Sequence, residues 1–332
     1  MSKIKFAVLG CGRIGLKHID FIQNNDEAEL VAIIDKNINE KEIIHKYKFN
    51  SLDEFLNSNL DVDIVSIATP NGYHAQNSLQ ILESGMHVLI EKPMALNKKD
   101  AEKIIKKSID KNKKIFVVMQ NRYSPILNSI KNAVEKNNFG EIYFININCF
   151  WNRNNKYFDN HEWHGNLKND GGVLFTQFSH FIDAIYWIFG DFINIETSLK
   201  KFLKNKKIQF EDTGTVKFEL FNGAICNFNF TISSYNKHFE SSISIISQKG
   251  NIKIEGQYLD EVSYYDTEKK FEIKDHRSIP DYYNNYDNRQ VNHALVVQNA
   301  IDVLKNNSEI KTNALDGLKV IEIIEKIYEK GR

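Results

Sequence analysis

The first 35 residues hold the pattern that most constrains the fold of this chain. The apolar segment Lys5–Leu9 leads directly into Gly10-Cys11-Gly12-Arg13-Ile14-Gly15, which fits GxGxxG, and an amphipathic segment follows. Glycines at these positions let a tight turn bring backbone amides and the positive end of a helix close to a pyrophosphate. The pattern therefore predicts a strand, a glycine-rich loop and a helix that bind a dinucleotide.

The acidic residue Asp35 extends this pattern. It ends the second apolar segment, where a carboxylate can accept hydrogen bonds from an adenosine ribose. Its charge would repel a 2′-phosphate, so the sequence favours NAD over NADP, and Lys36 beside it weakens that preference. The alternative is a glycine turn in a doubly wound sheet that binds no dinucleotide.

The first third of the chain alternates short apolar segments with longer amphipathic ones, which is typical of βαβ units with a parallel sheet. We expect strands at Lys5–Leu9, Leu30–Ile34, Ile64–Ala68, His87–Ile90 and Ile115–Met119. We expect helices at Ile14–Asn24, Lys41–Tyr47, Tyr73–Glu83 and Lys98–Asp110. The fold class is therefore α/β, with a doubly wound, dinucleotide-binding domain over residues 1–122.

A polar break at Asn121–Pro125 marks the start of a second domain, over residues 123–332, in which the spacing of apolar segments is different. We expect strands at Ile142–Phe150, Thr213–Phe221, Ala224–Ile232, Ser241–Ser247 and Asn251–Glu255, and helices at Pro125–Lys136, Phe175–Phe189, Val291–Lys305 and Ala314–Glu329. The pairs Asn222-Gly223 and Gly250-Asn251 suit tight hairpin turns. These strands should therefore form a mostly antiparallel sheet.

Composition excludes several classes of protein. The chain has 43 basic and 43 acidic residues, so its formal net charge is zero, which argues against a broad electrostatic surface for nucleic acid or anionic lipid. The apolar run at the start is too short to cross a membrane. Three scattered cysteines suit a reducing cytoplasm rather than a disulfide framework. We therefore expect a cytoplasmic protein with no nucleic-acid or membrane partner.

Two loops follow expected strands and carry candidate cofactor ligands. In open α/β sheets, ligands lie at the carboxyl ends of the strands. Thr69, Asn71 and His74 leave one such end, and Glu91 and Lys92 leave another. Asn71 and His74 could equally belong to a proline turn with a helix cap. A lysine at this edge can hydrogen-bond or deprotonate a substrate hydroxyl, and Pro93 can fix its backbone, also through a cis bond.

A polar stripe lies on the expected helix of the second domain. Asp170-Gly171-Gly172 precedes it, and Thr176, His180 and Asp183 share one helical face. A histidine on such a face is either a satisfied core group or a proton carrier, and its surroundings alone favour the core interpretation.

Together, these motifs resemble the glucose-fructose oxidoreductase and inositol dehydrogenase (Gfo/Idh/MocA) family over nearly the whole chain. The resemblance rests on Gly10 to Gly15, Glu91-Lys92-Pro93, and Gly171-Gly172 with His180 and Asp183. It implies a Rossmann domain that binds NAD through Gly10, Gly12, Arg13, Ile14, Gly15, Asp35, Thr69, Asn71, His74, Glu91 and Lys92. It also implies an α/β domain whose open sheet often serves as an oligomer interface, and it places Lys92 and His180 at the nicotinamide as catalytic residues.

One branch of that family is similar in finer detail. Many members have aspartate where this chain has Thr176, so no carboxylate takes that role here. Thr176-Gln177 with Ser179-His180, the segment Gln120–Tyr123, and Trp151 with Arg153 and Tyr157 resemble the branch that oxidises the 3″-hydroxyl of UDP-N-acetylglucosaminuronate. That branch serves the synthesis of 2,3-diamino sugars for surface polysaccharides such as lipopolysaccharide. Its members can hold NADH and reoxidise it with 2-oxoglutarate, and a homotetramer or dimer is expected.

A uronate carboxylate and a diphosphate need cationic or hydroxyl donors. The expected substrate-binding residues are Lys92, Arg122, Arg153, Tyr157, His164, Thr176, Gln177 and His180. Arg153 could instead be a surface residue, and the neighbouring tryptophans could simply pack. His161 and His164 lack an accompanying acidic or thiol ligand set, and hydride transfer needs no metal, so we expect none.

The expected mechanism places the sugar between the domains, with its C3 hydrogen directed at the nicotinamide. His180 is the favoured base and Lys92 the positioning and proton-relay group, although the two roles are interchangeable on the sequence. Tyr282-Tyr283 and Asn292-His293 could close the nucleotide end of the site or pack against another subunit. Two alternatives stay open: the same chemistry on another sugar or polyol, and a non-catalytic NAD-binding protein.

Overall fold

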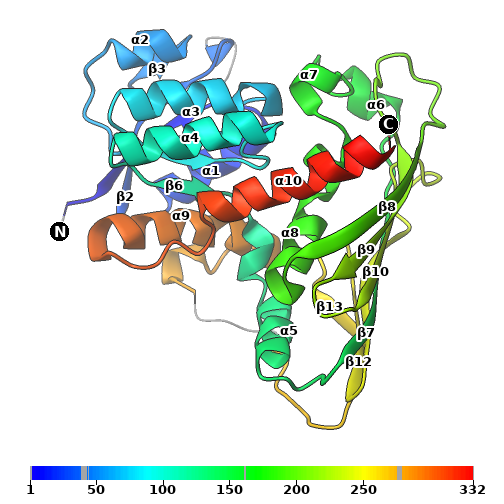
Figure 1. Cartoon of the computed structure of the whole chain (residues 1–332). Helices are drawn as coiled ribbons and strands as arrows, with labels where there is room; N and C mark the ends of the chain where they lie inside the picture. Colours follow the sequence, from blue (N-terminus) through cyan, green and yellow to red (C-terminus); the bar gives the residue numbers. More distant parts are fainter. Residues whose placement is uncertain (1, 39–42, 44, 161, 275–278, 332) are drawn as a thin grey trace. The chain divides into compact units, whose positions relative to one another are not determined.

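The computed structural model describes residues 2–38, 43, 45–160, 162–274 and 279–331, and these divide into two compact units (Figure 1). Unit 1 contains Met1–Gln120 and Ser278–Ile321, and unit 2 contains Asn121–Arg277 and Glu322–Arg332. The first division falls close to the expected boundary after residue 122. The last part of the chain is shared between the two units, whereas the sequence assigned all of it to the second domain. The predicted domain limits therefore stay a prediction.

Unit 1 is built on a six-stranded parallel sheet with the order β3-β2-β1-β4-β5-β6. Its strands are β1 Ile4–Leu9, β2 Ala28–Ile34, β3 Lys48–Phe49, β4 Ile64–Ile67, β5 His87–Ile90 and β6 Ile115–Val117. β1 pairs with both β2 and β4, so the chain changes direction across the sheet there. This order is that of a Rossmann sheet, and the predicted α/β class is confirmed.

The helices of unit 1 are α1 Arg13–Gln23, α2 Leu52–Leu56, α3 His74–Glu83, α4 Lys98–Asp110 and α9 Asn288–Asn306. α10, Ala314–Gly331, begins in unit 1 and ends in unit 2. α1 packs against β1, β2 and β4, and α3 packs against β4 and β5. α3 and α4 lie side by side, and α9 contacts α1 (Figure 1). The Asn97 side chain caps α4 by accepting the Asp100 amide, 2.8 Å away.

Unit 2 contains a seven-stranded sheet with the order β13-β12-β11-β7-β10-β9-β8. Its strands are β7 Ile142–Phe150, β8 Phe192–Lys200, β9 Thr213–Leu220, β10 Ile225–Thr231, β11 Glu240–Ser247, β12 Gly250–Glu255 and β13 Glu261–Thr267. All neighbours are antiparallel except β7 and β10, which are parallel. The predicted hairpins β9–β10 and β11–β12 are confirmed.

The helices of unit 2 are α5 Pro125–Glu135, α6 Asn155–Asp159, α7 Leu167–Asp170 and α8 Ser179–Phe189. A π-helical turn, η4 Leu174–Phe178, leads directly into α8. Phe178 at its end packs on Phe228 and Phe230 of β10, with ring centroids 6.1 and 5.5 Å apart. These aromatic contacts fix η4 against the sheet.

Several expected elements differ from the structure. The helix expected over Lys41–Tyr47 includes residues 41, 42 and 44, which lie outside the described residues, while residues 43 and 45–47 are not helical. The helix expected over Phe175–Phe189 is present, but its first turn is π rather than α. β3, β8, β13, α2, α6 and α7 were not expected. β13 is mostly polar and exposed, so it lacks an apolar signal. β8 alternates apolar and polar residues, which is the pattern of a half-buried strand and could have predicted it.

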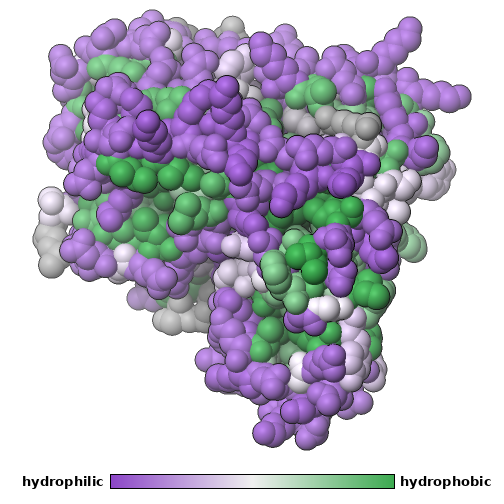
Figure 2. All heavy atoms as spheres, viewed as in Figure 1, coloured by the Kyte–Doolittle hydropathy of each residue, from purple (hydrophilic) through white to green (hydrophobic). Residues whose placement is uncertain are grey.

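The surface view in Figure 2 is dominated by hydrophilic side chains, with smaller apolar patches among them. Among the described residues, no helix is both long and apolar enough to span a membrane. The three cysteines are buried and are not in disulfides.

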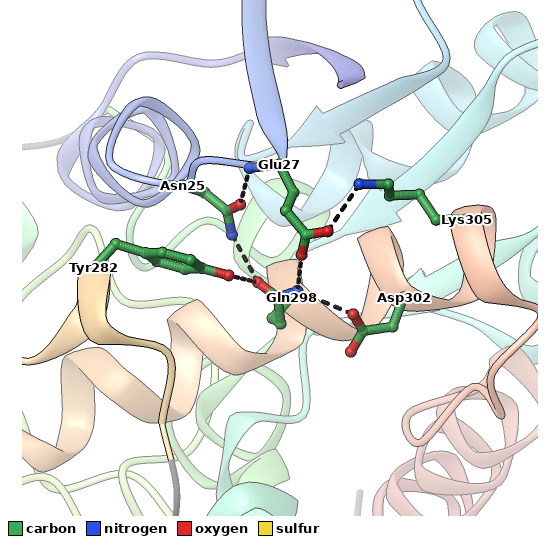
Figure 3. Close-up of polar contacts among 6 residues, drawn as sticks. All are labelled: Asn25, Glu27, Tyr282, Gln298, Asp302 and Lys305. Carbon is green, nitrogen blue, oxygen red and sulfur yellow. Dashed lines mark hydrogen bonds and ion pairs between the residues drawn. The ribbon is translucent and has the colours of Figure 1, made fainter. Parts of the chain in front are cut away.

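A partly buried polar network joins α9 to the turn between α1 and β2 in unit 1 (Figure 3). Gln298 of α9 accepts hydrogen bonds from Asn25 at 2.8 Å and Tyr282 at 2.5 Å. Its amide donates to Glu27 and to Asp302, both at 2.9 Å. Gln298 therefore uses both donors and both acceptor positions of its amide.

Tyr282 and Tyr283 belong to this network rather than to an open loop. Tyr283 is fully buried and accepts a hydrogen bond from Asn25 at 2.8 Å. Burial raises the pKa of Tyr282 to about 12. Both tyrosines thus have structural partners within unit 1.

We predict that Gln298→Leu destabilises the protein because it removes four hydrogen bonds, one of them to buried Asn25. The expected loss is about 2–3 kcal/mol in the free energy of unfolding, measured by denaturant titration. Asn306→Leu places the same apolar side chain at an exposed position of α9 and should change that free energy by less than ~0.5 kcal/mol. Equal effects of the two substitutions would contradict a structural role for the network.

Candidate active site

The glycine loop of unit 1 is packed so tightly that two of its glycines have no room for a side chain. Gly10 has a φ of +91°, and a Cβ there would lie 2.7 Å from the carbonyl carbon of Ala68. A Cβ on Gly15 would lie 1.8 Å from the carbonyl oxygen of Gly10. Both glycines therefore let α1 begin directly against the carboxyl ends of β1 and β4.

The start of α1 is suited to a negatively charged ligand. Gly12 occupies the N-cap position, and a Cβ there would meet no described atom within 4 Å. The first amides of a helix lack intrahelical acceptors, and the helix dipole favours an anion at this end. The loop can therefore hold a pyrophosphate through its backbone.

Asp35 lies next to this loop. Its Oδ2 accepts the Cys11 amide at 2.7 Å, and its Oδ1 accepts the Asn37 amide at 2.9 Å. The carboxylate is thus held at the end of β2, where a ribose would follow the pyrophosphate. The glycine cradle and this acid together fit NAD, and the acid disfavours a 2′-phosphate.

His74, at the start of α3, bridges two loops of the same sheet edge. Its Nδ1 lies 2.7 Å from the Pro93 carbonyl oxygen, and its Nε2 lies 2.7 Å from that of Thr69. Burial lowers the pKa of His74. The His74 ring thus has two backbone partners. The expected contacts of His74 and of buried Asn71 with the cofactor stay predictions.

Lys92 lies two residues after the end of β5 and follows buried Glu91. The Lys92–Pro93 peptide bond is cis, as the sequence allowed. The residues expected to bind the cofactor therefore gather along the carboxyl edge of one sheet, from β1, β2, β4 and β5.

Unit 2 brings together four of the residues expected to bind substrate. Arg153 Nε donates to Gln177 Oε1 at 2.8 Å, and the Gln177 amide donates to Tyr157 Oη at 2.7 Å. The Arg153 guanidinium lies 5.1 Å from the Tyr157 ring centroid. The His164 ring stacks on the Tyr157 ring, with the two ring centroids 4.2 Å apart. These four residues form the Arg153 cluster.

A residue that the sequence did not reveal lies beside the Arg153 cluster. His238 Nδ1 accepts the Asn152 amide at 3.0 Å, and its Nε2 lies 3.2 Å from Arg153 Nη1. Burial, and then the charge of Arg153, lower the pKa of His238. His238 lies in the segment between β10 and β11, where no motif marked it. The Arg153 guanidinium thus lies against the rings of Trp151 and Tyr157, with His238 beside it.

The π-helical turn η4 carries Thr176 and leads to His180. Within 171–180, all of which the structure describes, only these two residues are partly exposed. The Thr176 hydroxyl is hydrogen-bonded to the buried Asp170 carboxylate. π-helical turns often occur at functional sites, since they change which side chains share a face.

A close contact explains why Gly172 precedes this turn. Gly172 has a φ of +116°, and a Cβ there would lie 2.3 Å from Tyr328 Oη. That hydroxyl donates to Glu211 at 2.6 Å and accepts the Leu174 amide at 3.2 Å. The end of α10 therefore anchors the first turn of η4.

Arg122 has a different environment from the Arg153 cluster. Its Nη2 lies 2.7 Å from Asp183 Oδ1, and both side chains are buried. Arg122 therefore binds α8, and its expected contact with substrate stays a prediction. Asp183, the last member of the expected polar stripe, is part of this ion pair.

His161 lies outside the described residues, and His164 is engaged with Tyr157. Across the described part of the chain, no three side chains of His, Cys, Asp or Glu group in a way that could hold a metal ion. The expectation of a metal-free reaction stays a prediction.

Comparison with known proteins agrees with this geometry. Residues 4–119 match the model of the oxidoreductase family with an NAD-binding Rossmann fold, named GFO_IDH_MocA. Residues 131–332 match the model of its C-terminal alpha/beta domain.

Two solved structures are similar over nearly the whole chain. The WlbA dehydrogenase from Bordetella pertussis, in complex with NADH and UDP-GlcNAcA, is 30% identical with a TM-score of 0.89, over 99% of this chain and 97% of that chain. The WlbA dehydrogenase from Chromobacterium violaceum, in complex with the same two ligands, is 31% identical with a TM-score of 0.87, over 100% of this chain and 94% of that chain.

Curated relatives match less of their length. Glucose-6-phosphate 3-dehydrogenase from Bacillus subtilis is 26% identical over 75% of this chain and 73% of that protein. An uncharacterized oxidoreductase from Synechocystis is 24% identical over 68% of this chain, and the match spans 64% of its own length. The two family models together match most of the sequence, so the chain belongs to the Gfo/Idh/MocA family of oxidoreductases and carries that family's NAD-binding Rossmann domain.

Proposed function

We propose that this protein uses NAD to oxidise the 3-hydroxyl of UDP-N-acetylglucosaminuronate to its 3-keto form, in the synthesis of amino sugars for surface polysaccharides. The observation that carries the proposal is the Arg153 cluster, since it supplies a guanidinium, an amide and aromatic rings for an anionic sugar. The similarity to two WlbA dehydrogenases solved with UDP-GlcNAcA supports this choice of substrate.

The chemistry of the substrate explains why such a cluster is needed. A uronate carboxylate and a diphosphate are both anionic, and guanidinium groups bind such oxygens in pairs of charge-assisted hydrogen bonds. Tyr157 stays a neutral hydroxyl donor, because burial and the nearby Asp170 carboxylate raise its pKa to about 12. We assign Arg153, Tyr157, Gln177 and His164 to binding of the substrate, with Thr176 on the adjacent turn.

Two residues are proposed to act on the hydroxyl that is oxidised. Bound NAD supplies the acceptor for the hydrogen on the substrate carbon. His180 takes the hydroxyl proton, since histidine titrates near neutral pH, and Lys92 orients the hydroxyl through its ammonium group. The reverse assignment of the two roles is equally consistent with their chemistry.

A second candidate function is the oxidation of another sugar by the same chemistry. The match to glucose-6-phosphate 3-dehydrogenase from Bacillus subtilis favours it, since that name describes an anionic sugar oxidised at the same position. The Arg153 cluster could bind a phosphate as well as a carboxylate. The two candidates therefore differ in substrate and not in mechanism.

Further proposals concern the setting of the enzyme. We propose that it works in the cytoplasm as a homotetramer and that 2-oxoglutarate can reoxidise its NADH. The open face of the unit 2 sheet suits contact with a second copy because the neighbouring side chains of Ile225, Phe144 and Ile246 are partly exposed there, beside a row of asparagines. Asn229 donates to Asn148 at 3.1 Å and to Asn146 at 3.3 Å.

We predict that the purified protein with NAD forms a 3-keto product from UDP-N-acetylglucosaminuronate and not from glucose 6-phosphate. Product mass spectrometry, with and without 2-oxoglutarate, is the measurement, because tightly held NADH would hide an absorbance change. UDP-N-acetylglucosamine, which lacks the carboxylate, is the matched control substrate. Product from glucose 6-phosphate alone would favour the second candidate instead.

We predict that Lys92→Met and His180→Leu each lower kcat by about 10²–10⁴-fold, because each removes a group that holds or moves the hydroxyl proton. NADH affinity, measured by fluorescence titration, should change by less than about threefold. Full turnover by either variant would remove that residue from the mechanism.

We predict that Arg153→Met raises KM for the uronate substrate by about 10–100-fold, since a charge-assisted pair of hydrogen bonds is lost. Arg153→Lys should recover part of this loss. An unchanged KM in Arg153→Met would show that the Arg153 cluster does not bind the anionic group.

A further inference from the structure

Three buried polar side chains from three elements meet in the interior of unit 1. His18 of α1 lies with its Nδ1 2.6 Å from Ser66 Oγ on β4. Its Nε2 lies 3.1 Å from Oε1 of Glu91, directly after β5. All three residues are buried. This triad links the helix that follows the glycine loop to the strand that leads to Lys92.

Glu91 stays charged in this environment because of its partners. Burial alone would raise its pKa, but the hydrogen bond and charge of His18 outweigh that cost. With smaller contributions from His293 and Lys92, they lower the pKa of Glu91 to about 2. A buried carboxylate is stable only when it is paired in this way. The orientation of Glu91 therefore depends on His18.

The second oxygen of Glu91 acts on the next residue. Glu91 Oε2 accepts the backbone amide of Lys92 at 3.2 Å. On the other side of Lys92, the Pro93 carbonyl oxygen contacts His74 Nδ1 at 2.7 Å. Two buried histidines thus hold the backbone around Lys92. His18 acts before it, through the Glu91 carboxylate, and His74 acts after it, by direct contact with the Pro93 carbonyl oxygen.

We propose that His18 is a positioning residue for Lys92: through Glu91 it fixes the backbone from which the lysine side chain reaches its substrate. This inference rests on the proposed function only in giving Lys92 a catalytic role. His18 is buried, and its two ring nitrogens face Ser66 and Glu91, so its effect on Lys92 passes through Glu91. A displacement of about 1 Å in a reacting group can cost about 100-fold in rate, so a loose backbone at Lys92 should lower kcat without weakening binding.

The first test compares two substitutions of His18 with a matched control. His18→Leu removes both hydrogen bonds and should lower kcat about 10–100-fold, with KM and NADH affinity within about threefold of the native protein. His18→Gln keeps a donor toward Glu91 and should recover most of kcat. The control His87→Leu changes a histidine at the opposite, amino end of β5 and should leave kcat within about twofold.

The pH profile gives a readout that simple destabilisation would not move. In the native protein Glu91 is ionised at every assay pH, because its pKa is lowered to about 2. In His18→Leu, burial without the imidazole raises that pKa, so activity should fall further as the pH is lowered. The double variant His18→Leu/Glu91→Gln has no carboxylate to protonate, so its activity should fall at low pH only as much as that of the native protein.

Hydrogen exchange tests the inference without any substrate. The Lys92 amide should exchange faster in His18→Leu than in the native protein or in His87→Leu, because Glu91 no longer accepts it steadily. Unchanged exchange and an unchanged kcat in His18→Leu would overturn the inference. If the native protein oxidises no sugar, the proposed function fails, and the exchange experiment still decides whether His18 fixes this backbone.

Discussion

The close approach of Gly10, Gly15 and Ala68 is the constraint on which the rest of unit 1 depends. With a Cβ on Gly15 only 1.8 Å from the Gly10 carbonyl oxygen, no other residue lets α1 start at this point. The approach sets the first turn of α1 against the ends of β1 and β4. β4 pairs in parallel with β1 and with β5, so the carboxyl ends of these three strands lie at one edge of the sheet. The two glycines bring the start of α1 to that edge, where the Lys92 loop also begins.

Local patterns predicted the elements whose signal is local. His87–Ile90, Lys98–Asp110 and Ile142–Phe150 have the expected bounds, because apolar periodicity and a capping asparagine mark them. The π-helical turn could not be predicted, since it is anchored by Tyr328, more than a hundred residues later. Nor could the parallel pairing of β7 with β10, because turn chemistry specifies only adjacent strands.

The candidate site likewise contains residues that local motifs predicted and residues that only the fold identifies. Arg153, Tyr157 and Gln177 were predicted from short motifs, and the structure joins them by hydrogen bonds. His18 and His238 were missed because a histidine on an amphipathic helix or in a loop has no local signature. Its role follows only from the partner that the fold brings to each ring nitrogen. For His18 those partners are 48 and 73 residues away in the sequence.

The buried triad of His18, Ser66 and Glu91 is a costly way to fill the interior of unit 1. Apolar side chains of similar volume often stabilise a protein as well as a buried ion pair does, or better. What apolar packing does not provide is direction: a carboxylate with one oxygen on an imidazole presents the other in a fixed orientation. Here that oxygen lies 3.2 Å from the Lys92 amide. A requirement for stability alone does not explain this arrangement. A requirement to fix the backbone of Lys92, so that the lysine meets its substrate at one angle, does explain it.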